Sequence, residues 1–148
     1  MRAVVQRVSW ACVSAEGREL SRIDAGLLVY LGIGREDQER DVEYLADKIA
    51  NLRVFEKDGQ MAESILDTKA DVLVVSQFTL YGDVRRGRRP DFLGAMRPEA
   101  AEALYERFLS ALAMTGVFVR SGTFGAKMLV ESANDGPVTI LLDSQKVF

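Results

Sequence analysis

Histidine is absent from this chain of 148 residues, and cysteine occurs once, as Cys12. Without histidine, neither a Ser-His-Asp triad nor a Cys-His pair can form. A zinc site would have to combine one cysteine with carboxylates, which is not a usual zinc ligand set, so we expect no metal and no other cofactor. A general base that works near neutral pH must then be a carboxylate or lysine of shifted pKa, a backbone group, or a group of the substrate.

Long apolar runs are also missing. The longest, at residues 26–33, is much shorter than the roughly 20 residues that span a bilayer, and Arg2 and Arg7 interrupt the N-terminal segment where a signal peptide would be apolar. A single cysteine allows no internal disulfide, which is usual in reducing compartments. We therefore expect a cytoplasmic protein with no membrane partner.

The composition is that of an ordinary soluble globular protein, with 48% hydrophobic and 28% charged residues. A chain of this length suits one domain, and we expect residues 1–148 to form a single one. The net charge is −3. Any contact with phosphate groups must therefore come from a local positive patch.

The hydrophobic periodicity changes twice along the chain. Apolar residues recur at helical spacing between about residues 37 and 52, and again from Pro98 to Gly116. Valine-rich or alternating segments predict strands at residues 2–14, 19–23, 27–31, 72–80, 117–120, 127–132 and 138–142. We expect a single α/β domain, mostly β, in which antiparallel and mixed sheets form a barrel-like core with two long helices packed on them.

The segment 72–83 changes abruptly from apolar to polar. Residues 72–75 predict a strand buried on both faces, and the residues that follow supply hydroxyl, amide and aromatic groups: Ser76, Gln77, Phe78 and Thr79. Polar groups at the end of a rigid strand are well placed for chemistry, although a strand whose last residues simply reach solvent gives the same pattern. On a straight strand these four side chains would alternate between two faces, so a site that uses all of them needs a bend or backbone N–H groups.

Four arginines follow within five residues: Arg85, Arg86, Arg88 and Arg89, around Gly87. Guanidinium groups bind phosphate in a bidentate manner, and a glycine-broken loop can wrap around such groups. The alternative is a solvated loop. Because the cluster adjoins the polar strand end, we favour the phosphate-binding interpretation.

Four segments together resemble the D-aminoacyl-tRNA deacylases (D-tyrosyl-tRNA deacylases) over almost the full length. They are M-R-A-V-V-Q-R-V at residues 1–8, S-Q-F-T-L at 76–80, F-G-A-K-M at 124–128 and N-D-G-P-V-T at 134–139. The chain departs from the family pattern at Ala62, where the family usually has asparagine, so a polar role at that position is in doubt.

The resemblance implies hydrolysis of the ester that joins a mischarged D-amino acid to the terminal adenosine of tRNA, in a homodimer. It places the Gly136–Pro137 segment of each subunit in the pocket of the other, with a cis peptide bond that turns its carbonyls toward the substrate. L-amino acids would be excluded by this backbone wall, whereas glycyl-tRNA would pass it. Other substrate-binding residues implied by the resemblance are Arg7, Asn134, Phe124, Gly125 and Met128. An arginine within a strand otherwise faces solvent, so the resemblance alone places Arg7 beside the pocket.

Ester hydrolysis needs a nucleophile and donors for the developing oxyanion. We expect the segment 76–79 to position the substrate and stabilise the oxyanion, because the hydroxyl of Thr79 is a weak nucleophile without an adjacent base. The base would then be the 2′-hydroxyl of the substrate's terminal ribose, as the resemblance also implies. Core packing is the default role of Phe78 and Phe124, whereas the resemblance places one or both of them beside the adenine. A function of another class, a non-catalytic RNA-binding domain that uses the arginine loop, is the alternative.

Overall fold

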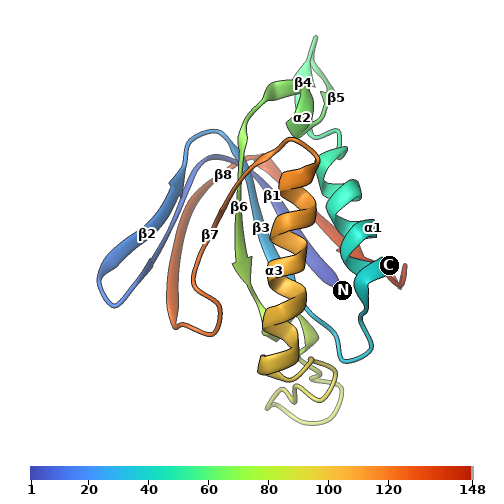
Figure 1. Ribbon diagram of the computed structural model, residues 1–148. Coiled ribbons are helices and arrows are strands. Elements are labelled where there is room, and N and C mark those ends of the chain that lie inside the picture. The colour runs from blue at the N-terminus through green and yellow to red at the C-terminus, as the bar shows by residue number, and fades with distance from the viewer. Residues whose placement is uncertain (148) are drawn as a thin grey trace.

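The computed structural model describes residues 1–147, which form one mostly β domain with two long helices (Figure 1). The large sheet contains β1 (Arg2–Ala15), β2 (Arg18–Ile23), β3 (Gly26–Gly32), β6 (Asp71–Ser76), β7 (Phe118–Ser121) and β8 (Met128–Asp143). A separate hairpin is formed by β4 (Phe55–Lys57) and β5 (Gln60–Glu63). The helical elements are α1 (Glu39–Ala50), the short α2 (Ile65–Thr68), the 3₁₀ turn η1 (Phe78–Tyr81) and α3 (Pro98–Met114).

The long strand β1 organises the sheet. Its first half pairs with β3 and its second half with β2, while β8 runs antiparallel to it along both halves. Strands β3, β6 and β7 continue the sheet in parallel. The two ends of the sheet approach one another, because the Ser21 hydroxyl of β2 donates a hydrogen bond of 2.7 Å to the Ser121 carbonyl of β7. The sheet is therefore nearly closed, which confirms the predicted barrel-like core.

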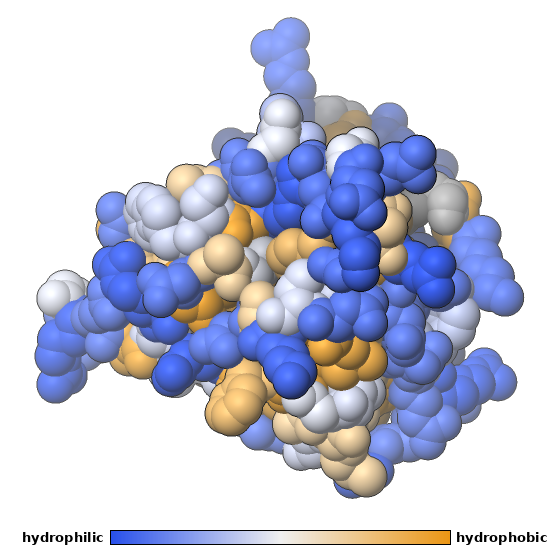
Figure 2. All heavy atoms as spheres, turned by 90° about the horizontal axis from the view of Figure 1, so that it is seen from above, coloured by the Kyte–Doolittle hydropathy of each residue, from blue (hydrophilic) through white to orange (hydrophobic). Residues whose placement is uncertain are grey.

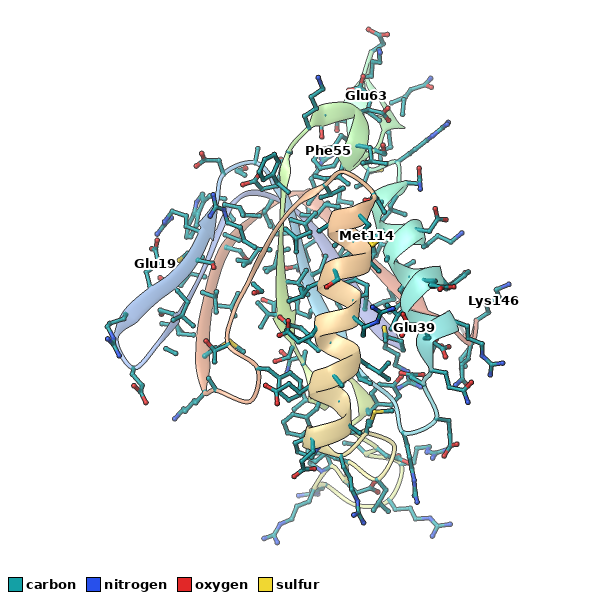
Figure 3. The ribbon with its side chains drawn as sticks, viewed as in Figure 1. Glu19, Glu39, Phe55, Glu63, Met114 and Lys146 are labelled. Atoms are coloured by element: carbon teal, nitrogen blue, oxygen red, sulfur yellow. The ribbon has the colours of Figure 1, made fainter. Side chains whose placement is uncertain are left out.

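The two long helices lie side by side over one face of the sheet (Figure 1). Glu39, labelled in Figure 3 at the start of α1, forms an ion pair with an N···O distance of 2.5 Å, and its partner is Arg107 of α3. Beneath them, the helix side chains Leu45, Ile49 and Phe108 pack with strand residues in the main core. No helix within residues 1–147 is long and apolar enough to span a membrane.

Strand β6 is buried on both faces, as its apolar sequence predicts. Val72 and Val74 belong to the core under the helices, whereas Leu73 and Val75 belong to a second apolar cluster on the opposite face of the sheet. The strand therefore provides a rigid base for whatever follows it.

Two of the predicted strand boundaries are wrong. The strand predicted at residues 72–80 ends at Ser76 in the structure. The Gln77 N–H still donates to the Leu31 carbonyl of β3 at 2.7 Å, and the chain then turns into η1. The predicted strands 127–132 and 138–142 are one strand, β8, which passes through the intervening segment 133–137. Irregular pairing with β1 near Val8 accommodates that segment without ending the strand.

Candidate active site

A pocket of about 610 Å³ opens where β6 ends, between η1, the β7–β8 loop and the start of α3. Six residues predicted from the sequence line it: Ser76, Gln77, Phe78, Phe124, Gly125 and Met128. They come from two segments about fifty residues apart, which the parallel pairing of β6 with β7 brings together. The geometry thus joins the S-Q-F-T-L segment to the F-G-A-K-M segment in one concave site.

The turn η1 sets the directions in which the side chains of the polar segment point. Because the chain bends at Gln77, the strict alternation of a strand is lost, and both Phe78 and Thr79 are exposed. The Thr79 hydroxyl accepts a hydrogen bond from the Gln77 side-chain amide. Thr79 does not line the pocket within the chain, although the residue before it does.

Phe78 is 57% exposed, so its default role in core packing is wrong. Its ring meets the edge of Phe92, with 4.9 Å between the centroids. Phe92 also lines the pocket, and sequence reasoning missed it. The signal that could have found it is an aromatic residue close after the arginine run, separated from it by Pro90 and Asp91.

Phe124 is half-buried and serves both the core and the pocket. Its ring packs on Tyr105 of α3, with 5.5 Å between centroids, and the Tyr105 hydroxyl donates to the Val74 carbonyl at 3.0 Å. Burial raises the pKa of Tyr105, which keeps this hydroxyl protonated as a donor. This wall of the pocket is therefore fixed to the core.

A second cluster of predicted site residues surrounds Arg7. The expectation that an arginine within a strand faces solvent is wrong here, because only 6% of Arg7 is exposed. Its guanidinium donates to the Val54 carbonyl over 2.6 Å. It also lies 3.5 Å from a carboxylate oxygen of Glu56 and 3.3 Å from one of Asp135. The contact with Asp135 is an ion pair of poor hydrogen-bond geometry, because the Arg7 Nε atom has no hydrogen-bond partner among the described residues.

Asn134 holds the segment around Gly136 and Pro137. Its carbonyl oxygen accepts from the Val138 N–H at 3.2 Å, and its amide donates to the Thr139 hydroxyl at 2.9 Å. The Gly136–Pro137 bond is cis, as the resemblance implies, and both residues are exposed. Gly136 has a φ of +117°, and a Cβ there would lie 2.8 Å from a Val138 methyl carbon and 3.0 Å from the Arg7 guanidinium.

The two clusters lie at opposite ends of the domain. Arg7 contacts Val54 and Glu56 beside the β4–β5 hairpin, whereas the pocket lies near the segment 83–97 at the other end (Figure 1). Within one chain, Arg7, Asn134, Gly136 and Pro137 do not line the pocket. Figure 2 views the β4–β5 end, where polar side chains surround small apolar patches. Ala62 is exposed on β5 at this end.

The arginine loop is closed by a backbone bridge between Asp83 and Asp91, with N–H···O distances of 2.8 and 3.0 Å. The Arg85 side chain is bound to the Asp83 carboxylate, with its Nε atom at 2.9 Å and its Nη2 atom at 2.5 Å. These hydrogen bonds lower the pKa of Asp83 to about 2. The other loop arginines are exposed and form no ion pair with any residue in 1–147: Arg86, Arg88 and Arg89.

Comparisons with known proteins agree with one another. The family model "D-Tyr-tRNA(Tyr) deacylase" matches residues 4–143. Proteins named D-aminoacyl-tRNA deacylase from Thermotoga petrophila and Fervidobacterium nodosum are 56% and 53% identical, and each alignment covers all of both chains.

Two solved structures share the fold. One, titled "c-Myc DNA Unwinding Element Binding Protein", is 46% identical with a TM-score of 0.92, and the match covers 97% of this chain and 98% of that one. The other, from a study of a probable eukaryotic D-amino acid tRNA deacylase, is 18% identical with a TM-score of 0.84 over 95% and 97% of the two chains, and shows the fold alone. The full-length identity and the family match, together with a pocket lined by two of the four segments that carry the resemblance, show that this chain belongs to the D-aminoacyl-tRNA deacylase family.

Proposed function

We propose that this protein hydrolyses the ester bond of D-aminoacyl-tRNA and releases the free D-amino acid and tRNA. The observation that carries the proposal is the pocket in which the Ser76–Phe78 segment faces Phe124 and Met128. It is largely apolar, and its polar side chains are Ser76 and Gln77 at the end of β6 and Arg97 just before α3, which suits a ligand that combines an apolar part with a few polar groups. Family membership supplies the substrate class.

Positioning and charge stabilisation are the chain's contribution to this chemistry. Water attacks the ester carbonyl carbon, the carbonyl oxygen takes up negative charge, and donors of the Ser76–Thr79 segment stabilise it. Collapse of the intermediate breaks the bond to the ribose oxygen, which leaves with a proton. Since the chain has no histidine, the neighbouring ribose 2′-hydroxyl relays the proton from the attacking water. Thr79 orients the substrate instead of forming an acyl intermediate, because its hydroxyl meets the Gln77 amide, which is no base.

The terminal adenine of tRNA would occupy the aromatic part of the pocket. Phe78 offers an exposed ring, and Phe124 forms the opposite wall. Stacking of a base on such a ring contributes about 1–3 kcal/mol. The rigid packing of Phe124 on Tyr105 would keep the adenine in one place relative to the Ser76–Thr79 segment.

Chiral selection is assigned to Gly136 and Pro137. Both residues are exposed on β8, in a stretch that the Asn134 side chain and the ion pair between Arg7 and Asp135 connect to its surroundings. Backbone carbonyls can accept from the substrate's α-amino group, and a fixed wall at that point excludes the side chain of an L-amino acid. A D side chain points away from the wall, so many D-amino acids are accepted. Glycine has no side chain to exclude, so glycyl-tRNA is also hydrolysed.

The separation of the two clusters supports a homodimer, which the family resemblance also implies. The Gly136–Pro137 segment does not line the pocket of its own chain, so we propose that a second copy supplies it. The outer edge of β8 is unpaired within residues 1–147, which leaves this strand available to a partner. Light scattering at micromolar concentration should give twice the chain mass of 16.4 kDa. A monomer at that concentration would count against both the dimer and the shared site.

The arginine loop is assigned to the phosphates of the acceptor end of tRNA, in the cytoplasm. Three of its side chains are exposed and free of intramolecular ion pairs among the described residues, in a chain that is acidic as a whole. The same loop also favours the second candidate function, a non-catalytic RNA-binding domain.

One assay separates the two functions. Metal-stripped protein is incubated with D-tyrosyl-tRNA, L-tyrosyl-tRNA or glycyl-tRNA, and the free amino acid is measured. Hydrolysis of the D and glycyl substrates, with the L substrate intact, supports the proposed function. Binding of all three without release would leave the RNA-binding domain, and equal rates for the D and L substrates would refute chiral selection.

A further inference from the structure

Arg2 contacts the turn η1 outside the pocket, at two residues that do not line it. Its Nη1 atom donates to the Leu80 carbonyl at 3.0 Å, and its Nε atom donates to the Asp143 carboxylate, also at 3.0 Å. The guanidinium lies over the Tyr81 ring, 4.6 Å from its centroid. One side chain from the first strand thus joins the end of the last strand to both residues that complete η1.

Tyr81 is held from three further directions. Its hydroxyl donates to the buried Asp37 carboxylate at 3.4 Å. Its ring fills the space left by two glycines: a Cβ at Gly34 would lie 2.5 Å from the hydroxyl oxygen, and a Cβ at Gly94 would lie 3.4 Å from a ring carbon. Burial, followed by the charge of Asp37, raises the pKa of Tyr81, so the hydroxyl stays a donor.

Within the turn itself, few backbone hydrogen bonds stabilise the conformation. Its own backbone bonds are Leu80 N–H to the Gln77 carbonyl at 3.3 Å and Gly82 N–H to the Thr79 carbonyl at 2.9 Å. A single 3₁₀ turn with exposed residues is weak in isolation. Phe78 has a ring contact with Phe92 and Thr79 a hydrogen bond from Gln77, but the backbone that carries both residues is attached to the rest of the domain through Leu80 and Tyr81, which follow directly.

We propose that Arg2 is a positioning residue for the deacylation reaction, which fixes η1, and with it Phe78 and Thr79, from outside the pocket through Leu80 and Tyr81. This inference rests on the proposed function, in which the Ser76–Thr79 segment acts on the ester. Arg2 does not touch the pocket. Its effect is therefore on the orientation of groups that act in the transition state, where a misplacement of about 1 Å can cost on the order of a hundredfold in rate.

The test compares Arg2→Ala and Arg2→Lys with Arg22→Ala as a matched control. Arg22 also combines an ion pair, to Glu19 at 2.9 Å, with an aromatic contact, 5.5 Å from the Trp10 centroid, but it lies on β2, away from η1. Lysine at position 2 keeps the charge pairing with Asp143 but cannot donate to two acceptors while stacking flat on Tyr81.

Steady-state deacylation of D-tyrosyl-tRNA should show a loss of kcat of tenfold or more for both Arg2 variants, with KM changed less than about threefold. Arg22→Ala should keep both constants. Restoration of kcat by Arg2→Lys would show that only the ion pair matters and would overturn the proposal. An Arg2→Ala loss confined to KM, or matched by Arg22→Ala, would overturn it equally.

Hydrogen exchange provides a readout that needs no substrate. The amides of Leu80 and Gly82 should exchange at least tenfold faster in Arg2→Ala and Arg2→Lys, while amides of β6 keep their protection. Unchanged exchange at both amides would refute the positioning role whatever the enzyme assay shows. If the wild type released no amino acid but these amides lost protection, the proposed function would fail and the attachment of η1 by Arg2 would stand.

Discussion

Charge on the arginine loop can be removed without disturbing its structure, because only one of its four arginines takes part in the loop's own ion pairing. We predict that replacing Arg86, Arg88 and Arg89 together by alanine weakens tRNA binding and flattens its dependence on salt. The matched control is Arg85→Ala. Arg85 is already bound to Asp83, so it has little charge left to offer a phosphate.

The magnitude follows from counterion release. Each phosphate contact contributes about 0.7 to the slope of log affinity against log salt for single strands and about 0.9 for duplexes. Three contacts therefore account for a slope of about 2–3. Between about 50 and about 200 mM salt, the wild type should lose roughly 20- to 40-fold more affinity than the triple variant.

Fluorescence anisotropy with labelled tRNA that carries no amino acid measures this slope, because no ester is present to be hydrolysed. The triple variant should bind with a slope lower by about 2–3, whereas Arg85→Ala should change it by less than about 1. An unchanged slope in the triple variant would show that the loop is merely solvated. If Arg85→Ala flattened the slope as much as the triple variant, the conclusion that the Arg85 charge is paired with Asp83 and not with a phosphate would be wrong.

Three further predictions concern the reaction itself. Chelation should leave the deacylation rate unchanged, because the chain has no histidine and one cysteine, and a loss restored by added metal would contradict this. Thr79→Ala should retain a measurable rate, while tRNA ending in 2′-deoxyadenosine should be the poorer substrate; a covalent acyl–Thr79 adduct detected by mass spectrometry would reverse the assignment. Gly136→Ala should lower the unfolding temperature and raise the ratio of L to D hydrolysis, because its φ of +117° costs about 1–3 kcal/mol and its Cβ meets Val138. The control is Gly17→Ala, where φ is +75° but nothing lies within 4 Å; an equal change in selectivity there would refute the role of Gly136.

Local patterns predicted the regular elements well. Val42, Leu45 and Ile49 recur at helical spacing and are buried on α1, and the apolar run before Ser76 is a strand covered on both faces. In both cases the signal is the pattern of apolar residues within a short segment, and that pattern indicates which faces of the helix or strand are buried. The grouping of Ser76–Phe78 with Phe124 and Met128, by contrast, was reached through the family resemblance, and the pairing of β6 with β7 supplies its physical basis.

The rest depends on contacts between distant segments. The end of β6 is set by β3, because the Leu31 carbonyl takes the Gln77 N–H and Gly32 leaves room for Leu80, whose Cβ would lie 3.0 Å from a Cβ at that glycine. Burial of Arg7 depends on the Val54 carbonyl, 47 residues away. A proline within a strand normally indicates its end. Nothing near Pro137 in the sequence shows that β1 pairs on both sides of it and continues the strand.

The placement of the pocket and the Gly136–Pro137 segment at opposite ends of one chain has a genetic consequence. If each complete site takes one part from each subunit, two defective variants can complement one another. A protein damaged in Ser76–Phe78 would be inactive alone and one damaged at Gly136 would have lost its selectivity, but a mixed dimer contains one intact pocket with one intact Gly-Pro segment. With random exchange of subunits, about a quarter of all sites would be complete, since half of the dimers are mixed and each restores one site. Recovery of D-selective hydrolysis at about that share of sites on mixing would show that a complete site is a property of the dimer and not of the single chain.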